Sequence, residues 1–425
     1  MKVAFVIQRY GAEILGGAES LCRLIAERLA QRHEVDVLTT CARDYITWKN
    51  EYPEGADRIK GVTVRRFANA RTRDIATFNR YSDWIFNNPH SRDEEMEWLR
   101  QQGPWSPALI EYLQRTHASY DVLIFFTYLY APTVMGLGID PGRSLLVPTA
   151  HDEPPIHLEI YRDVFSQPAA IAYNTEAERR FVNRTFRIQA AEETIGCGID
   201  LPHESHPFPR SAPPPRRDEP AEEEEAADEA QQYPSHLAGR GAVFRRRHRL
   251  HGPFVLYGGR IDPGKGCEEL IEYFNTYVDQ GGEAILALMG VKLMRLPEEP
   301  FIRFAGLLSE RERLQALEAA TIVVVPSPYE SLSLLALEAF SVGTPVLANA
   351  RSEVLVEHCL RSNAGLFYAD RDEFVECLNL LVSHEVLRVA MGRNGRQYVR
   401  HEYRWDVILG KYDRLFAKIR SRAEK

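Results

Sequence analysis

The chain has 425 residues, of which 44% are hydrophobic and 26% are charged. These proportions are those of a globular protein, and the length is too great for one ordinary domain but suits two. The formal net charge is -8, which equals the charge of the eight acidic residues between Asp218 and Glu229. The acidity is therefore a local tract and not a surface field that would repel nucleic acid or anionic substrates. We expect no nucleic-acid partner.

The six cysteines are dispersed along the chain, and none forms a Cys-x-x-Cys pair. They predict reduced core thiols in a cytoplasmic protein and argue against metal ligation by cysteine. The apolar run at 3–7 is too short for a secretory signal, and no apolar run approaches 18 residues. We therefore expect neither a signal peptide nor a transmembrane helix.

The first residues predict a βαβ unit with a glycine-rich first turn. Residues 3–7 are a β-branched run typical of a buried strand, a helix follows over 21–29, and 34–40 is a second strand. Gly16 and Gly17 precede the helix, where adjacent glycines allow close approach of a ligand. Taken alone they are explained more simply by a tight turn, and without G-x-G-x-x-G no dinucleotide site is predicted.

Residues 42–118 have an irregular pattern. We predict a strand at 62–67, helices near 83–86 and 95–99, and a helix start at 104–107. The scattered aromatic residues fit core packing better than the lining of an acceptor site.

Three more strands are predicted at 120–126, 144–150 and 169–175. His151 and Asp152 directly follow the second of them, at the edge of the sheet where α/β proteins bind ligands. A His–Asp pair there could act as acid and base. Because the chain has no nucleophile elbow, we favour a hydrogen bond from His151 to a substrate hydroxyl.

The composition predicts domain boundaries. Residues 201–243, with three successive prolines and the acidic tract, are too poor in apolar residues to fold and predict a disordered linker or insertion. We expect domains at 1–200 and 244–400, and a helical segment at 401–425 for which packing back on the N-terminal domain is one option. The basic run 245–249 is more simply a solvated strip than a contact with anionic lipid, so peripheral membrane binding stays a hypothesis.

The second half alternates strands and helices, which predicts a second doubly wound domain. Its first strand leads into Gly259–Lys265, which matches most of a Walker A pattern. Gly266 stands where a Ser or Thr would hold magnesium, and Pro263 removes one N–H donor. We therefore predict no P-loop NTPase, although Arg260 and Lys265 beside these glycines suit a diphosphate bound without a metal. Strands are predicted at 254–257, 284–290, 301–304, 322–325, 345–348 and 365–368, and a helix at 310–320.

Two glutamates accompany the helix that follows the strand at 322–325 and ends at Gly343. Glu330 precedes this helix and Glu338 lies within it, about 12 Å further along the axis at ~1.5 Å per residue. The N–H groups and dipole of the helix start suit an anion between them, as part of an extended ligand. The alternative is two solvated glutamates. A D-x-D pattern at 370–372, which could indicate manganese, is explained adequately by capping of the next helix.

Together these motifs resemble those of the retaining glycosyltransferase family 4, which has the GT-B fold. The resemblance implies an α/β protein of two Rossmann-like doubly wound domains facing a central cleft. It rests on Gly258-Gly-Arg260 with Lys265-Gly266, Phe304-x-Gly306, Pro326-Ser-x-x-Glu330-x7-Glu338-Ala and Gly343-x-Pro345-Val, and in the first half on Gly16–Glu19, His151-Asp152, Asn174–Glu176 and Gly198–Asp200.

The resemblance also implies a role for each site residue. Arg260 and Lys265 would neutralise the donor diphosphate, Glu338 would bind the ribose, and Glu330 would lie beside the transferred sugar. The expected catalytic residues are His151, Glu330, Arg260 and Lys265, and the expected substrate-binding residues are Gly16, Gly17, Arg260, Lys265, Ser331, Leu332, Ser333, Leu334 and Glu338.

The function implied is a metal-independent, cofactor-free hexosyltransferase of polysaccharide biosynthesis, moving sugar from a nucleotide diphosphate to a glycan, glycolipid or other acceptor. The alternatives are a GT-B epimerase or phosphorylase, or a non-catalytic scaffold that binds sugar nucleotides. The chain departs from the family at 331–333, where Ser-Leu-Ser replaces glycine-aromatic-glycine, and at 291–294, a predicted loop that lacks a second glycine after Gly290. These departures bear on the sugar and the base of the donor.

Overall fold

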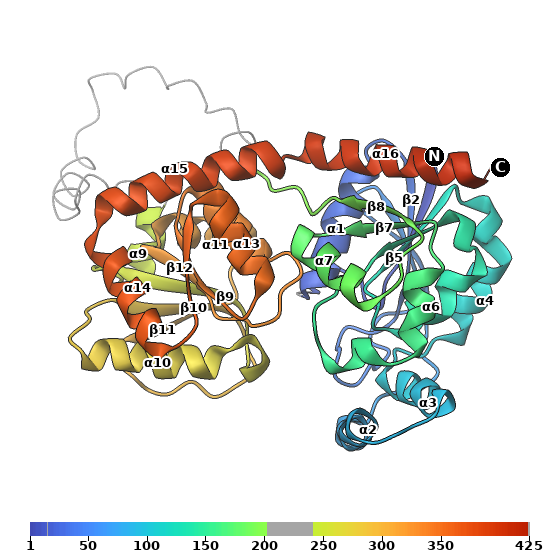
Figure 1. Cartoon of the computed structure of the whole chain (residues 1–425), viewed down its shortest axis with the longest axis horizontal. Coiled ribbons are helices and arrows are strands. Elements are labelled where there is room, and N and C mark those ends of the chain that lie inside the picture. Colours follow the sequence, from blue (N-terminus) through green and yellow to red (C-terminus); the bar gives the residue numbers. More distant parts are fainter. Residues whose placement is uncertain (15, 202–240, 424–425) are drawn as a thin grey trace, which may run out of the picture. The chain divides into compact units, whose positions relative to one another are not determined.

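The computed structural model describes residues 1–14, 16–201 and 241–423. They form two compact units, one of Met1–Gly198 with Trp405–Lys425 and the other of Ile199–Arg404 (Figure 1). The predicted linker at 201–243 falls mostly on 202–240, outside the described residues, and its last residues open a helix at Gly241.

The first unit is built on an eight-stranded sheet with the order β3-β4-β2-β1-β5-β6-β7-β8. All pairings are parallel except that of β3 with β4. Its strands are β1 (Lys2–Val6), β2 (Glu34–Thr40), β3 (Gly55–Ile59), β4 (Val62–Phe67), β5 (Val122–Phe126), β6 (Ser144–Val147), β7 (Ala170–Tyr173) and β8 (Ala191–Thr194).

The edge strands β3 and β8 were not predicted, because neither carries an alternating apolar pattern. Strand β6 ends three residues earlier than predicted. Pro148 follows it and has no N–H for the sheet, and Thr149 turns the backbone into the left-handed region at φ 51°. This turn directs the chain out of the sheet just before His151.

The helices of the first unit surround this sheet, and Thr175 caps α7 by accepting a hydrogen bond from the Glu178 N–H, as predicted. The helices are α1 (Gly17–Leu29), α2 (Ile75–Asn87), α3 (Arg92–Gln102), α4 (Pro107–Thr116), α5 (Ala131–Gly136), α6 (Ile160–Ser166), α7 (Glu176–Thr185) and α16 (Trp405–Ala423), with short 3-10 helices at His117–Ser119, Leu137–Ile139, Pro141–Arg143 and Pro154–His157.

Helix α16 is the last helix described, yet it belongs to the first unit, where it packs against β8 (Figure 1). Lys411 Nζ donates to the Thr194 carbonyl at 3.0 Å, and Arg414 forms an ion pair with Glu193. The apolar side of the helix is buried and consists of Ile408, Leu409, Tyr412, Leu415, Phe416 and Ile419.

The second unit contains a six-stranded parallel sheet with the order β11-β10-β9-β12-β13-β14. Numbered within the unit this order is 3-2-1-4-5-6, that of Rossmann dinucleotide-binding domains, and it reverses between β9 and β12. The strands are β9 (Phe254–Ile261), β10 (Ile285–Lys292), β11 (Ile302–Gly306), β12 (Ile322–Val325), β13 (Val346–Asn349) and β14 (Gly365–Tyr368). The helices are α9 (Gly241–His248), α10 (Cys267–Asp279), α11 (Glu310–Ala319), α12 (Leu334–Val342), α13 (Glu353–Ser362), α14 (Arg371–Ser383) and α15 (Glu385–Glu402), with a 3-10 helix, η6 (Pro263–Lys265).

Strands β9 and β10 continue beyond their predicted ends, so the loop expected after Gly290 begins only after Lys292. The two strands stay paired because Gly259 lies opposite Gly290, where an added Cβ would come within 1.9 Å of the Gly259 carbonyl oxygen. The two-domain α/β class predicted from the sequence is confirmed by these two sheets.

The basic run 245–249 is not a wholly solvated strip, because Arg245 is buried. Its guanidinium donates to the carbonyls of Gly252 at 2.8 Å and Ala319 at 2.7 Å. Arg245 therefore fastens α9 to the domain. Among the described residues, no helix combines the length and the apolar character needed to cross a membrane.

Candidate functional site

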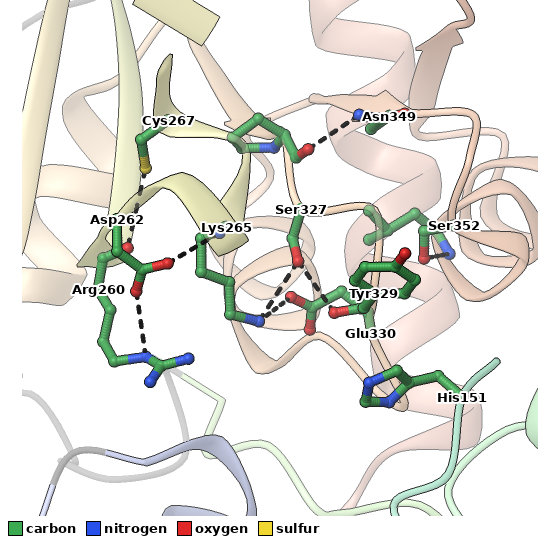
Figure 2. A network of polar contacts seen from close by, with 12 residues as sticks. His151, Arg260, Asp262, Lys265, Cys267, Ser327, Tyr329, Glu330, Asn349 and Ser352 are labelled. Atoms are coloured by element: carbon green, nitrogen blue, oxygen red, sulfur yellow. Dashed lines mark hydrogen bonds and ion pairs between the residues drawn. The ribbon is translucent and has the colours of Figure 1, made fainter. Parts of the chain in front are cut away.

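The switch point of the second sheet brings together two predicted site residues that lie far apart in the sequence. Lys265 ends the turn after β9, and Glu330 lies in the loop after β12. Lys265 Nζ is 2.8 Å from Glu330 Oε1 and 3.4 Å from Ser327 Oγ, as the dashed lines in Figure 2 show. The side chain of Lys265 is 29% exposed and that of Glu330 17%. Charged groups of both signs thus meet where open α/β sheets bind ligands.

The turn that carries Lys265 is fixed by its neighbours. The Asp262 side chain accepts a hydrogen bond from the Lys265 N–H at 3.0 Å and caps the 3-10 turn η6. Gly266 follows at φ 74°, and a Cβ there would lie 2.5 Å from the Pro326 carbonyl oxygen. This close approach of η6 to the end of β12 explains why glycine occupies the position at which a P-loop has Ser or Thr.

Arg260 lies near the end of β9, just before this turn (Figure 2). Its Nε is 3.6 Å from Asp262 Oδ2. The Tyr257 hydroxyl donates to the Arg260 backbone carbonyl at 2.6 Å. The side chain is 35% exposed, so the backbone is anchored while the guanidinium keeps access to solvent.

The loop between β12 and α12 contains the predicted residues 331–334. Ser333 is the N-cap residue of α12 and adopts φ 62° and ψ 75°, in the left-handed region that favours glycine. The first N–H groups of α12 have no partner within the helix, since a helix leaves its first turn unsatisfied. The helix ends at Gly343 in the left-handed conformation, as predicted.

Glu338 is not a solvated residue, because it is 9% exposed and forms an ion pair with Arg313 of α11. Burial raises the pKa of the Glu338 carboxyl, although the Arg313 guanidinium opposes the rise. Arg313 was not predicted, since local sequence patterns do not indicate which side chains of two helices will meet. The alternative of two solvated glutamates is thus wrong for Glu338, and Glu330 is partly exposed but paired with Lys265.

In the first unit, Gly16 and Gly17 start α1. A Cβ at Gly16 would come within 1.9 Å of the Glu19 carboxylate, whereas a Cβ at Gly17 would meet nothing within 4 Å. Gly16 is therefore required by packing, and Gly17 borders open space. Glu19 is buried and forms an ion pair with Arg9 at 2.6 Å, and it accepts a hydrogen bond from Gln8 at 3.0 Å. Sequence reasoning missed this network, although polar residues directly after a buried strand were a signal for it.

His151 does not pair with Asp152, contrary to the His–Asp pair considered from the sequence. Its Nε2 is 3.3 Å from Glu153 Oε2, whereas Asp152 contacts His157 at 2.9 Å. In extended backbone, residues two apart point to the same side, which favours His151 with Glu153. The Tyr128 hydroxyl also donates to Glu153 at 2.6 Å. Burial acts to raise the pKa of Glu153, but the bonds from His151 and Tyr128 outweigh it and lower that pKa.

Glu178 of α7 holds the segment before His151. Its carboxyl oxygens accept hydrogen bonds from the backbone N–H groups of Ala150 and Asn174, each at 2.6 Å. Burial raises the pKa of Glu178 to about 8, against the effect of these N–H groups. The loops after β6 and β7 are thus joined by one buried carboxyl group.

The D-x-D pattern is a helix cap, as expected, because Asp370 accepts a hydrogen bond from the Glu373 N–H at 2.9 Å. Within the described residues, no three His, Cys, Asp or Glu side chains cluster in a way that could hold a metal ion.

The two Rossmann-like units, with a lysine, an arginine and a glutamate at the switch point of the second, have the architecture of GT-B glycosyltransferases. Residues 243–398 match the family model described as Glycosyl transferases group 1, so the second unit carries a domain of this family.

Curated relatives match over part of their length. A GDP-mannose-dependent monoacylated alpha-(1-6)-phosphatidylinositol monomannoside mannosyltransferase of Corynebacterium glutamicum is 26% identical over 170 residues, 37% of this chain and 45% of that protein. A D-inositol 3-phosphate glycosyltransferase of Corynebacterium jeikeium is 28% identical over 200 residues, 42% of this chain and 47% of that protein. The chain therefore spans less than half the length of these relatives.

Solved structures match over nearly the whole chain. Sucrose-phosphate synthase from Thermosynechococcus elongatus superposes with a TM-score of 0.68 at 18% identity and covers 98% of both chains. Anabaena Alr3699/HepE in complex with UDP and glucose superposes with a TM-score of 0.64 at 17% identity, covering 99% of this chain and 100% of that one. At these identities the likeness shows a shared fold.

Proposed function

We propose that the protein is a retaining, metal-independent glycosyltransferase that moves a hexose from a nucleotide diphosphate to a glycan, glycolipid or other acceptor in polysaccharide biosynthesis. The observation that carries the proposal is the pairing of Lys265 with Glu330 at the switch point of a Rossmann-like sheet. The family match of residues 243–398 and the names of the curated relatives support a sugar nucleotide as the ligand. The retaining outcome and the independence from metal rest on the resemblance to family 4.

Each charged residue of the site has a role in the proposed transfer reaction. When the bond between sugar and diphosphate breaks, negative charge develops on the leaving phosphate, and the cations of Arg260 and Lys265 stabilise it. The N–H groups of residues 331–334 add dipoles of the same sign. Glu330 binds hydroxyls of the sugar, and Glu338 accepts hydrogen bonds from the ribose. The role proposed for His151, a hydrogen bond to a hydroxyl of the sugar, rests on its place in the loop after β6 and on the resemblance to family 4.

The first experiment is a thermal-shift screen against UDP, GDP and ADP and their glucose and mannose conjugates, followed by calorimetry of the tightest ligand. We expect one base to stabilise the protein clearly, and turnover of its sugar conjugate to survive a chelator. Absence of binding by any nucleoside diphosphate would refute the proposal. Binding without transfer or donor hydrolysis would instead support a scaffold.

Gly17→Ala tests the space left for the donor. Because a Cβ at Gly17 meets nothing within 4 Å, the variant should fold with unchanged stability. If the donor diphosphate lies against this glycine, its affinity should fall about tenfold or more, since even a displacement of about 1 Å in a binding site is costly. Gly252→Ala, which also adds a Cβ into open space, is the matched control and should bind as the wild type does. Equal affinity of the two variants would contradict the role given to Gly17.

A further inference from the structure

A buried histidine supports the loop that carries residues 331–333. His358 of α13 is 1% exposed, and its Nε2 lies 2.7 Å from the Leu332 carbonyl oxygen. A carbonyl oxygen only accepts hydrogen bonds, so Nε2 carries the proton and donates it. In the neutral ring the other nitrogen, Nδ1, is then an acceptor, and the Tyr398 hydroxyl lies 3.1 Å from it.

The polarity of this network continues one step further. Tyr398 gives its proton to His358, so its oxygen can accept from the Tyr403 hydroxyl at 3.3 Å. Burial lowers the pKa of His358 to about 4, which keeps the ring neutral with one donor and one acceptor at neutral pH. Two buried tyrosines therefore fix which nitrogen of His358 donates, and thereby secure the bond to Leu332.

The Leu332 carbonyl belongs to the peptide bond that enters the strained residue of the loop. Ser333 holds φ 62°, a conformation that costs a residue with a side chain about 1 kcal/mol or more. In a planar trans peptide the C=O and the following N–H point in opposite directions. The bond from His358 turns the Leu332 C=O toward α13, so the Ser333 N–H must point away from His358.

We propose that His358 is a positioning residue for the donor, because its hydrogen bond to Leu332 sets the direction in which the Ser333 N–H and the start of α12 meet the phosphates. The inference rests on the proposed function and adds to it a residue that none of the site motifs contains. His358 itself touches no phosphate and acts through the peptide between Leu332 and Ser333.

The test compares His358→Leu, which removes the donor, with His358→Gln, which keeps an N–H donor and an acceptor. Cys359→Ala is the matched control, since Cys359 is buried on the same helix next to His358. The readouts are the affinity for the nucleoside diphosphate that binds the wild type, and amide hydrogen exchange of the peptide that spans 327–337.

We expect His358→Leu to weaken diphosphate binding by about tenfold and to speed exchange in residues 331–334, because one buried hydrogen bond to the loop is lost. His358→Gln should recover most of the affinity, and Cys359→Ala should retain all of it while losing some thermal stability. If His358→Leu does not fold, Tyr398→Phe, which removes only the hydroxyl that orients the ring, should show the same changes at smaller size.

A folded His358→Leu with wild-type affinity and wild-type exchange would overturn the inference. A variant that loses stability but binds the diphosphate as the wild type does would also overturn it, since His358 would then be a core residue only. If the wild type binds no nucleoside diphosphate, the proposed function fails, and the positioning role fails with it. The exchange experiment still distinguishes this case, because it measures the loop without any ligand.

Discussion

The ion pair of Lys265 with Glu330 predicts that loss of the Lys265 ammonium group changes ligand affinity much more than stability. Lys265→Met keeps most of the apolar stem and removes the ammonium group that lies 2.8 Å from Glu330 and 3.4 Å from Ser327. Both charged side chains are partly exposed, so the pair itself contributes little to folding, about 1 kcal/mol or less. We therefore expect nearly unchanged thermal stability and a large change in affinity.

The change in affinity has two parts. A charge-assisted hydrogen bond between an ammonium and a phosphate contributes about 1.5–3 kcal/mol. Without Lys265, the Glu330 carboxylate is also left unpaired and repels the diphosphate. At a separation of about 4 Å and an effective dielectric constant near 20 the gross repulsion is about 4 kcal/mol, which solvent reduces to about 1 kcal/mol at a partly exposed site. The sum is about 3 kcal/mol, a loss of roughly 100-fold in affinity.

Glu330→Gln should change the affinity for the diphosphate in the opposite direction. It removes one negative charge and frees the ammonium of Lys265, so a nucleoside diphosphate without sugar should bind several-fold tighter, by about 1 kcal/mol. In the double variant the repulsive part is absent, and the loss should be nearer tenfold than 100-fold. This loss, about 2 kcal/mol, equals the sum of the two single effects (about 3 minus about 1), so a departure from additivity in the double variant would measure further competition for Lys265.

Calorimetric titration of the four proteins with one nucleoside diphosphate gives these numbers directly, and thermal unfolding confirms that each variant is folded. A Lys265→Met variant within about threefold of the wild type would refute the assignment of the diphosphate to this turn. If Glu330→Gln weakens binding of the sugar-free diphosphate as strongly as Lys265→Met, then Glu330 is itself a ligand of that molecule and not a competing charge.

Two further predictions concern stability. Ser333→Gly should raise the free energy of unfolding by up to about 1 kcal/mol in urea titrations, because glycine adopts φ 62° without a steric cost, and this gain exceeds the loss from the greater entropy of glycine in the unfolded chain. Ser331→Gly, at a residue without positive φ, should lower the free energy of unfolding by about 0.5–1 kcal/mol. Equal losses in both variants would contradict the argument. Glu178→Gln should flatten the pH dependence of stability between about 4.5 and 8, because the folded protein holds the Glu178 proton up to a pKa of about 8 while the unfolded chain releases it near 4.5. The contribution of this group to wild-type stability is therefore present below pH 4.5 and lost as the pH rises through 8, and identical slopes for both proteins in urea titrations from pH 5 to 8 would contradict it.

Much of the fold was predictable because its signals are local. The β-branched run at 322–325, the helix end at Gly343 and the caps at Thr175 and Asp370 each depend on a few neighbouring residues, and the structure confirms them. The strands β3 and β8 were not predictable in the same way, because these edge strands contain charged residues and show no apolar alternation.

The candidate site was likewise predictable only where its signals are local in the sequence. The residue types at 260, 265, 330 and 338 predicted a charged anion site, and the fold brings Lys265 and Glu330 into contact. The partners that fix the site come from elsewhere in the chain, such as Arg313 for Glu338, and no spacing within a motif indicates them. The left-handed conformation of Ser333 has a local signal in the sequence, since Ser333 stands where the resembled family has glycine, the residue that this conformation favours.

Helix α16 has a consequence for how the protein is made. The sheet of the first unit leaves the ribosome early, but the helix that covers β8 is synthesised only after the whole second unit. Domains usually fold in chain order during translation. Here the first unit cannot form its contacts to Ile408, Tyr412 and Phe416 until α16 has been synthesised, so the second unit can finish folding first. The nascent chain therefore presents an incomplete apolar surface while the second unit is synthesised, which makes chaperone binding during translation an expected part of its biogenesis.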